Sequence, residues 1–215
     1  SYSYTGKAKG ITVFDVDVEN GMFKERCEIE VDNSSYVIAS SDGKTQYSIA
    51  DEGVVSFRIL PNGSLARLNS SSIRGMRGCH LCTDEEDKYV FVSGYHDGKT
   101  TVLNLNPDGS VGKIVDGVFD RGYGSVAERN FRPHVTCTRR MPDNRFVLSV
   151  DNGIDQVKIY RFNDKEQKLV QVDAIRCDLE SAPRHFRYSK DGKFIYLMYE
   201  LKKAIEVYTY KTGDR

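Results

Sequence analysis

The chain has 215 residues, of which 39% are hydrophobic, and it carries 31 acidic and 31 basic side chains. This length can bury one sizeable core and lies in the range of a single large all-β domain. Because the charges balance, the composition does not favour nucleic acid or an anionic membrane surface, and an anion site would need a local cluster of basic residues. No apolar run approaches the roughly 18–20 residues that a membrane-spanning helix requires. We therefore expect neither a nucleic-acid partner nor a membrane.

The cysteines favour a reducing compartment. Cys27, Cys79, Cys82, Cys137 and Cys177 are odd in number and irregular in spacing, which argues against a disulfide framework. A Cys-x-x-Cys pair occurs once, and no second pair follows it in the sequence to complete a metal centre. The N-terminal stretch SYSYTGKAKG also lacks the apolar segment of a secretory signal. We expect a cytoplasmic protein that uses no metal and no cofactor.

Runs of strand-forming residues alternate with turns along the whole chain. The predicted strands include residues 10–18, 88–94, 99–105, 144–150, 156–162, 193–199 and 204–210. Some of these runs are rich in β-branched and aromatic residues, and others alternate apolar and polar residues with the period of half-buried strands. The turns between them include Asp42-Gly43, Asn62-Gly63, Asp108-Gly109 and Asp191-Gly192. Asx-Gly pairs readily adopt the positive φ angles that hairpins need.

These elements recur as a unit. The unit contains a short run, a turn, an apolar run, a polar gap and an alternating run that ends in an aromatic residue, followed by a second turn. Four short antiparallel strands per unit are typical of the blade of a β-propeller. We therefore predict an all-β fold in which residues 1–215 form a single β-propeller domain of four-stranded antiparallel blades, with about four to five blades in this chain. The predicted blades are approximately 1–32, 33–76, 77–131, 132–181 and 182–215, the first and last of them partial.

Polar residues occur at two recurring places in these units. The connections of a blade alternate between its two faces, so the loop that leads into the innermost strand and the loop after the second strand lie at the same mouth of the central channel. The first kind of loop carries arginine before histidine: Arg74 and Arg77 before His80, Arg129 and Arg132 before His134, and Arg184 before His185. The ends of the second strands carry Asp51, Glu52, Tyr95, His96, Asp151, Asp155 and Glu200.

This grouping predicts an anion site at one mouth of the propeller. Guanidinium groups match carboxylate and phosphate oxygens, and a histidine or glutamate beside them can move protons near neutral pH. We expect His80, His134 and His185 at equivalent positions of their blades. Structural roles are the alternative for each residue: a solvated loop arginine, a hydrogen-bonded wall histidine, or a Glu200 carboxylate that only pairs with Arg184.

Several stretches of the sequence carry a resemblance to a known family. They are NSSYVIASSDGK, GCHLCTD, RPHVTC, VDNGIDQVKIYRF and APRHFRYSKDGKFIYLMYEL. They resemble the lactonase family of seven-bladed β-propellers, which includes 6-phosphogluconolactonases and fungal 3-carboxy-cis,cis-muconate lactonizing enzymes. The similarity covers nearly the whole chain, and its Pro-Arg-His…Glu-Leu pair is fairly specific. Family members often have a second histidine two residues after the first, at the position of Thr136.

The resemblance implies a functional trio of His134, Arg184 and Glu200, which we take as the catalytic residues. We expect neighbouring residues to bind the substrate: His80, Tyr95, Arg132, Asp151 and His185. The favoured reaction is hydrolysis of a small anionic sugar lactone such as 6-phosphogluconolactone, in which Arg184 binds the anion or the oxyanion and Glu200 or His134 is the general base. The alternatives are a 3-carboxymuconate cycloisomerase acting on a polycarboxylate, and a non-catalytic propeller that binds a ligand or partner at this mouth.

The predicted blades fill only part of a seven-bladed ring. The first one lacks an inner strand and the last one ends after its third strand, which would leave an open sheet edge. We therefore expect that the chain is a fragment of a longer protein, or that a second chain completes the ring.

Overall fold

The structure, a computed structural model, describes residues 9–125 and 131–211 of the chain. This part of the chain forms β-strands joined by turns and loops, and it contains no helix that could cross a membrane. The all-β prediction is therefore confirmed.

The strands form antiparallel sheets of consecutive strands. A two-stranded sheet contains β1 (Gly10–Asp17) and β2 (Met22–Glu30). The first four-stranded sheet contains β3 (Val37–Ala39), β4 (Thr45–Ala50), β5 (Gly53–Ile59) and β6 (Leu65–Ser72). The second contains β7 (His80–Thr83), β8 (Tyr89–Gly94), β9 (Lys99–Leu105) and β10 (Val111–Phe119). The third contains β11 (Val135–Arg140), β12 (Val147–Asp151), β13 (Gln156–Asn163) and β14 (Lys168–Arg176). A three-stranded sheet of β15 (Pro183–Tyr188), β16 (Phe194–Tyr199) and β17 (Ile205–Thr209) follows.

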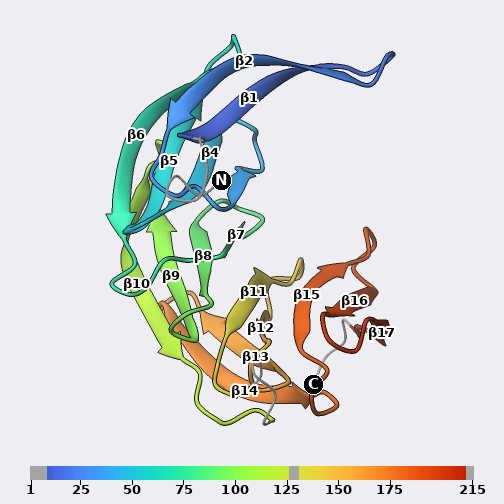
Figure 1. The fold of residues 1–215 in the computed structure, drawn as a ribbon. Helices are drawn as coiled ribbons and strands as arrows, with labels where there is room; N and C mark the ends of the chain where they lie inside the picture. The colour runs from blue at the N-terminus through green and yellow to red at the C-terminus, as the bar shows by residue number, and fades with distance from the viewer. Residues whose placement is uncertain (1–8, 126–130, 212–215) are drawn as a thin grey trace.

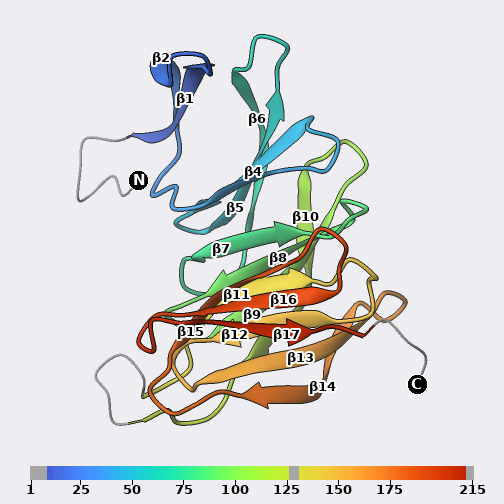
Figure 2. The ribbon, with the colours of Figure 1, turned by 90° about the vertical axis from the view of Figure 1, so that its right-hand side faces the viewer.

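The sheets follow one another around an arc, as the blades of a propeller do (Figure 1). The outer strands β6, β10 and β14 lie on the convex side of this arc, and β7, β11 and β15 lie on its concave side. Contacts between neighbouring sheets join β7 to β11 and β11 to β15 near the axis, and join β6 to β10 and β10 to β14 at the periphery. Figure 2 shows the same sheets stacked above one another, with β1 and β2 at the top. The prediction of four-stranded propeller blades is confirmed.

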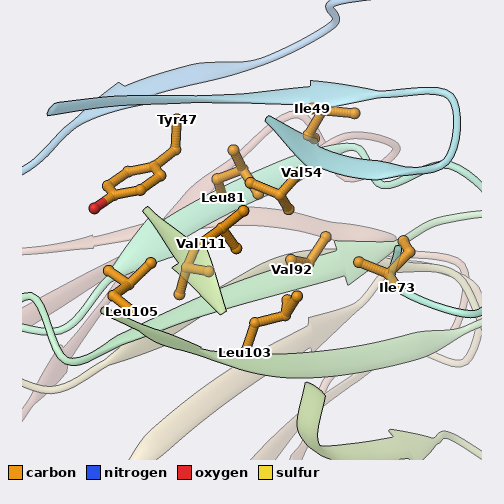
Figure 3. Packing of buried hydrophobic residues seen from close by; sticks show 10 residues of the cluster. Tyr47, Ile49, Val54, Ile73, Leu81, Val92, Leu103, Leu105 and Val111 are labelled. Atoms are coloured by element: carbon orange, nitrogen blue, oxygen red, sulfur yellow. The ribbon is translucent and has the colours of Figure 1, made fainter. Parts of the chain in front are cut away.

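The core lies between successive sheets, because each blade presents one apolar face to each neighbour. Figure 3 shows the cluster between the first two four-stranded sheets, in which Tyr47 and Ile49 of β4 face Leu81 of β7 and Val92 of β8. Leu81 and Ile49 are completely buried. Similar clusters fill the next two interfaces, so apolar burial between blades is the main force that holds the arc together.

One hairpin turn shows how neighbouring blades are locked together. Gly109, after Asp108, has φ +84°, a left-handed conformation that favours glycine. A Cβ at this position would collide with the side chain of Thr45 in the preceding blade. This close approach allows the Tyr47 hydroxyl to donate a hydrogen bond of 3.0 Å to the carbonyl oxygen of Gly109. The guanidinium of Arg58 donates another, 2.7 Å long, to the carbonyl oxygen of Asp108.

Candidate functional site

Arg184 and Glu200 lie side by side at one end of the central channel. Arg184 is the second residue of the inner strand β15, and Glu200 follows the last residue of β16. The two strands are antiparallel and pair Pro183 with Tyr199, so the hairpin brings the two charged residues together. Arg184 Nη1 donates to Glu200 Oε2 at 2.9 Å. Both side chains keep contact with solvent, because 47% of the arginine side chain and 32% of the glutamate side chain are exposed.

A cavity of about 440 Å³ opens at this pair. Its lining residues come from the inner ends of three sheets: Arg77, Gly78, Cys79, Tyr95, His96, Thr136, Arg184 and Glu200. Arg77 adds a second guanidinium, which pairs with Asp51 at 3.4 Å between Nη1 and Oδ1. The two arginines, Arg77 and Arg184, both line the cavity, whereas Glu200 is the one acidic residue among the described residues of its lining. Such an arrangement favours a small anionic guest.

β-Bulges direct side chains of the inner strands into this cavity. The pairing of β15 with β16 shifts between Pro183 and His185, so Arg184 is the extra residue of a bulge. The pairing of β11 with β12 shifts in the same way between Val135 and Cys137, and Thr136 is the extra residue there. Bulges re-aim side chains and are common beside active sites. Thr136 occupies the position in β11 that Arg184 occupies in β15.

Hydrogen bonds to the backbone hold the loop that precedes Arg184. Glu180 and Ala182 have φ values of 60° and 50°, a region that is costly for residues with a Cβ. The carboxylate of the buried Asp155 accepts hydrogen bonds from the backbone N–H of Glu180 at 2.9 Å and of Ala182 at 2.8 Å. The Ser181 hydroxyl donates to it at 3.4 Å. Asp155 thus stabilises the loop conformation from which β15 begins.

The carboxylate of Glu200 has a second neighbour. The amide nitrogen of Asn152 lies 3.4 Å from Glu200 Oε2 and 3.4 Å from the carbonyl oxygen of Ala182. Asn152 is buried and belongs to the turn after β12. Asn152 therefore connects the end of β16 to the adjacent blade and helps to orient the Glu200 carboxylate.

His134 lies behind the cavity wall. Its ring stacks on Tyr95, with ring centroids 4.3 Å apart and planes 13° from parallel, and it is only 4% exposed. Its Nδ1–H donates to the carbonyl oxygen of Tyr95 at 2.7 Å. Burial lowers the pKa of His134 below the ordinary histidine value. Tyr95 lines the cavity, so the histidine acts on this site through the residue it supports.

Asp151 is also buried away from the cavity. Its Oδ1 accepts hydrogen bonds from the backbone N–H of His134 at 2.8 Å and of Gly153 at 2.9 Å. Burial and a hydrogen bond with the carboxyl group of Asp120 raise the pKa of Asp151 to about 8. The two carboxyl groups thus share a proton at neutral pH, and the Tyr160 hydroxyl donates to Asp120 at 2.9 Å. In this structure Asp151 caps the turn after β12.

His80 and His185 face each other deeper in the channel, with ring centroids 5.3 Å apart. The residue of β11 at this level is Cys137, whereas His134 lies three residues earlier, before β11 begins. The expectation that His134 occupies the position equivalent to His80 and His185 is therefore wrong. The donor atoms of His80, Cys137 and His185 lie within 4.8 Å of one another and could hold a soft metal ion. The guanidinium of Arg139 lies 3.3 Å from His80 Nε2, so positive charge already occupies the approach to this cluster.

Burial keeps both histidines of this level neutral. It lowers the pKa of His185 to about 4 and that of His80 well below the ordinary value, and the charge of Arg139 adds to both effects. Burial raises the pKa of the Cys137 thiol to about 11. The cluster of His80, Cys137 and His185 is therefore uncharged at neutral pH, and the nearby charge is the guanidinium of Arg139.

Five residues of the predicted grouping line the cavity: Arg77, Tyr95, His96, Arg184 and Glu200. Arg132 lies at the rim, where its Nη1 donates to the carbonyl oxygen of His96 at 3.3 Å. Arg129 lies outside the described residues. Cys79 and Thr136 were not among the predicted site residues. A comparison of the inner strands at equivalent positions could have found Thr136, but only if the bulge had been recognised.

The fold and the site define a β-propeller with two arginines and a paired glutamate at one mouth of its channel. The chain belongs to the family described as "Lactonase, 7-bladed beta-propeller", which matches residues 2–215. It is 30% identical over 210 residues to a 6-phosphogluconolactonase of Bacillus subtilis, covering 94% of this chain and 59% of that protein. It is 27% identical to a 6-phosphogluconolactonase of Formosa agariphila, covering 99% of this chain and 64% of the relative.

Solved structures agree with this assignment. The periplasmic gluconolactonase of Pseudomonas aeruginosa superposes with a TM-score of 0.91 at 25% identity, covering 100% of this chain and 64% of that one. A crystal structure from Bacteroides fragilis gives the same TM-score at 31% identity and covers 63% of the neighbour. The chain thus spans about six tenths of the length of these relatives, between 59% and 64%.

Proposed function

We propose that the cavity between Arg77, Arg184 and Glu200 hydrolyses a small anionic sugar lactone, in the manner of a 6-phosphogluconolactonase. The observation that carries the proposal is the ion pair of Arg184 and Glu200, 2.9 Å long, beside a second arginine in one solvent-open cavity. A guanidinium supplies fixed positive charge for an oxyanion, and a carboxylate can accept a proton from water. The names of the relatives from Bacillus subtilis and Formosa agariphila support the same substrate class.

In this mechanism, water attacks the ring carbonyl carbon while Glu200 takes one of its protons. The carbonyl oxygen becomes an oxyanion, which a guanidinium stabilises; such a donor typically contributes about 3–4 kcal/mol. The ring C–O bond then breaks, and Glu200 returns the proton to the departing alkoxide oxygen. The products are the carboxylic acid and the free hydroxyl group. The second arginine binds the phosphate or other anionic group of the substrate.

The general base in this proposal is Glu200 and not His134. The carboxylate lines the cavity, whereas the histidine ring lies behind Tyr95. A thiol nucleophile is also disfavoured, although Cys79 lines the cavity. Burial raises the pKa of the Cys79 thiol to about 12, so almost none of it is thiolate at neutral pH.

The test is acid release from 6-phosphogluconolactone and from glucono-δ-lactone, compared with spontaneous hydrolysis under the same conditions. We expect the protein to accelerate both and to prefer the phosphorylated lactone. Arg184→Ala and Glu200→Gln should each lower kcat/KM by about 10²–10³-fold, the range seen when a single transition-state donor is removed. Arg176→Gln, an exposed substitution on β14, is the matched control. A rate equal to the spontaneous one refutes the proposal and leaves a binding protein.

We further propose that another propeller sheet, from a second chain or from another segment of a longer protein, covers the two flanking sheets. Their outer faces are apolar and exposed: Phe14, Val16 and Phe23 on one side, and Met198, Ile205 and Val207 on the other. Exposed apolar faces of this kind mark interaction surfaces. Light scattering should give a mass above 24.4 kDa for the functional form. A well-behaved monomer of the single-chain mass would contradict this proposal.

We also propose a cytoplasmic location. All five cysteines are free thiols, as expected in a reducing compartment. Immunodetection after fractionation of the source cells checks this, and recovery in an extracytoplasmic fraction would contradict it.

A further inference from the structure

The inner strands contribute side chains to the channel in three successive levels. The first level contains Cys79, Thr136 and Arg184 and belongs to the cavity already described. The second contains His80, Cys137 and His185. The third contains Cys82, Arg139 and Arg187, which line another cavity of about 330 Å³. Because the levels follow one another along β7, β11 and β15, the two cavities lie at opposite ends of the channel.

Arg139 is a buried cation whose charge is not balanced by a carboxylate. The residue is 8% exposed, and its Nε has no hydrogen-bond partner among the described residues. Its other nitrogens contact neutral groups: Nη2 lies 3.3 Å from His80 Nε2, and Nη1 lies 3.6 Å from Cys82 Sγ. Burial raises the pKa of the Cys82 thiol, so this sulfur is not a counter-ion. Burying a charge in this way is unfavourable unless an anion compensates it.

The acidic residues of the same cavity are engaged elsewhere. Asp84 is buried, accepts hydrogen bonds from the backbone N–H of Lys88 and Tyr89 at 2.8 Å each, and lies 3.6 Å from the guanidinium of Arg140. Glu85 is exposed and accepts a long hydrogen bond of 3.5 Å from the hydroxyl of Tyr188. Neither carboxylate forms an ion pair with Arg139 in the part of the chain that the structure describes.

Arg187 supplies a second guanidinium at this end of the channel. It lies on β15 two residues after His185, lines the cavity with Arg139, and forms no ion pair with any described residue. We propose that this cavity is a second anion site, in which Arg139 and Arg187 bind a small oxyanion such as a phosphate or carboxylate group. The proposal is independent of lactone hydrolysis, because the site lies at the other end of the channel and shares no lining residue with the first cavity.

The test separates the two ends of the channel. The double variant Arg77→Gln/Arg184→Gln serves as the background, since it removes both arginines of the first cavity. Titration calorimetry then measures binding of inorganic phosphate and of malonate. Sodium chloride at matched ionic strength measures general screening. We expect one site to remain in this background. The stronger of the two ligands identifies whether the natural anion is a phosphate or a carboxylate.

Further substitutions in this background decide the proposal. Arg139→Gln should weaken the remaining binding at least about tenfold, as expected for the loss of a charge-assisted hydrogen bond. Arg187→Gln, an exposed position, should weaken it similarly and carries the test if the buried variant does not fold. Arg176→Gln should leave it unchanged. The proposal is overturned if the Arg77→Gln/Arg184→Gln background binds no anion, or if Arg187→Gln and a folded Arg139→Gln both bind as tightly as the background.

Discussion

The hydroxyl of Thr136 donates a 2.7 Å hydrogen bond to the backbone carbonyl oxygen of Arg184. This bond joins the bulges of two neighbouring inner strands, β11 and β15. It therefore couples the packing of one blade to the position of the arginine in the next. The cavity is shaped by this contact between blades as much as by the local hairpin that brings Arg184 to Glu200.

Replacing Thr136 tests this coupling. Thr136→Val removes the hydroxyl and leaves the Arg184 carbonyl oxygen without this donor, which should cost about 1–3 kcal/mol of unfolding free energy. We expect kcat/KM for the lactone to fall about tenfold, because the arginine is less well positioned. Thr136→Ser keeps the donor and should retain most of the activity. Equal behaviour of the two variants in denaturant titrations and kinetics would show that the hydrogen bond is unimportant.

Asp155 should be necessary for the loop that leads into β15. In Asp155→Asn, one carboxylate oxygen becomes an amide nitrogen, which faces a backbone N–H of Glu180 or Ala182 and cannot accept its hydrogen bond. We expect a loss of about 1–3 kcal/mol in urea denaturation, together with weaker lactone hydrolysis. Asp32→Asn, at an exposed position, provides the control. Wild-type stability of Asp155→Asn would indicate that the loop conformation is maintained by other contacts.

The Asp120–Asp151 pair predicts a specific pH dependence of stability. The pKa of Asp151 is raised from 3.8 to about 8, so the folded state keeps a proton that the unfolded state has released. Its contribution is therefore complete below about pH 4 and is lost as the pH rises towards 8. His80, His134 and His185, whose pKa values are lowered from 6.5, act in the opposite direction, and their unfolded-state titration extends above pH 6.5. The histidines are common to the wild type and to an Asp151 variant, so the difference between these two proteins isolates the carboxyl pair.

Asp151→Asn should remove this dependence. The asparagine oxygen still accepts the N–H groups of His134 and Gly153, and its amide can donate to Asp120 as the protonated acid does. We expect the unfolding free energy of the wild type to fall between pH 6.5 and 8 relative to that of the variant. Denaturant titrations at several pH values measure both slopes. The same slope in wild type and variant would mean that Asp151 is already ionised at neutral pH.

The interface between the first two four-stranded sheets should be sensitive to truncation. Leu81 lies in the apolar cluster of this interface and is 0% exposed. Leu81→Ala should cost about 2–5 kcal/mol of unfolding free energy, because the truncation leaves a cavity in a packed core. Leu179→Ala, at a position that is 80% exposed, should change stability by less than about 0.5 kcal/mol. Thermal denaturation of both variants checks the contrast, and a small effect at Leu81 would argue against tight packing of this interface.

The sequence by itself determined the repeating strands, their hairpin turns and one part of the site. Alternating apolar residues and Asx-Gly pairs act locally, so strands such as β9 and turns such as Asp108-Gly109 could be predicted from neighbouring residues alone. The meeting of Arg184 with Glu200 was predictable for the same reason, since a single hairpin separates them by sixteen residues.

Only the tertiary structure decided which other side chains reach the channel. A bulge shifts a strand by one residue without a clear sequence signal, and this shift places Thr136 at the cavity and Cys137 at the level of His80 and His185. The burial of His134 behind Tyr95 depends on packing between separate blades. The uncompensated charge of Arg139 likewise follows from which residues surround it in space, and the spacing of residues along one chain does not contain that information.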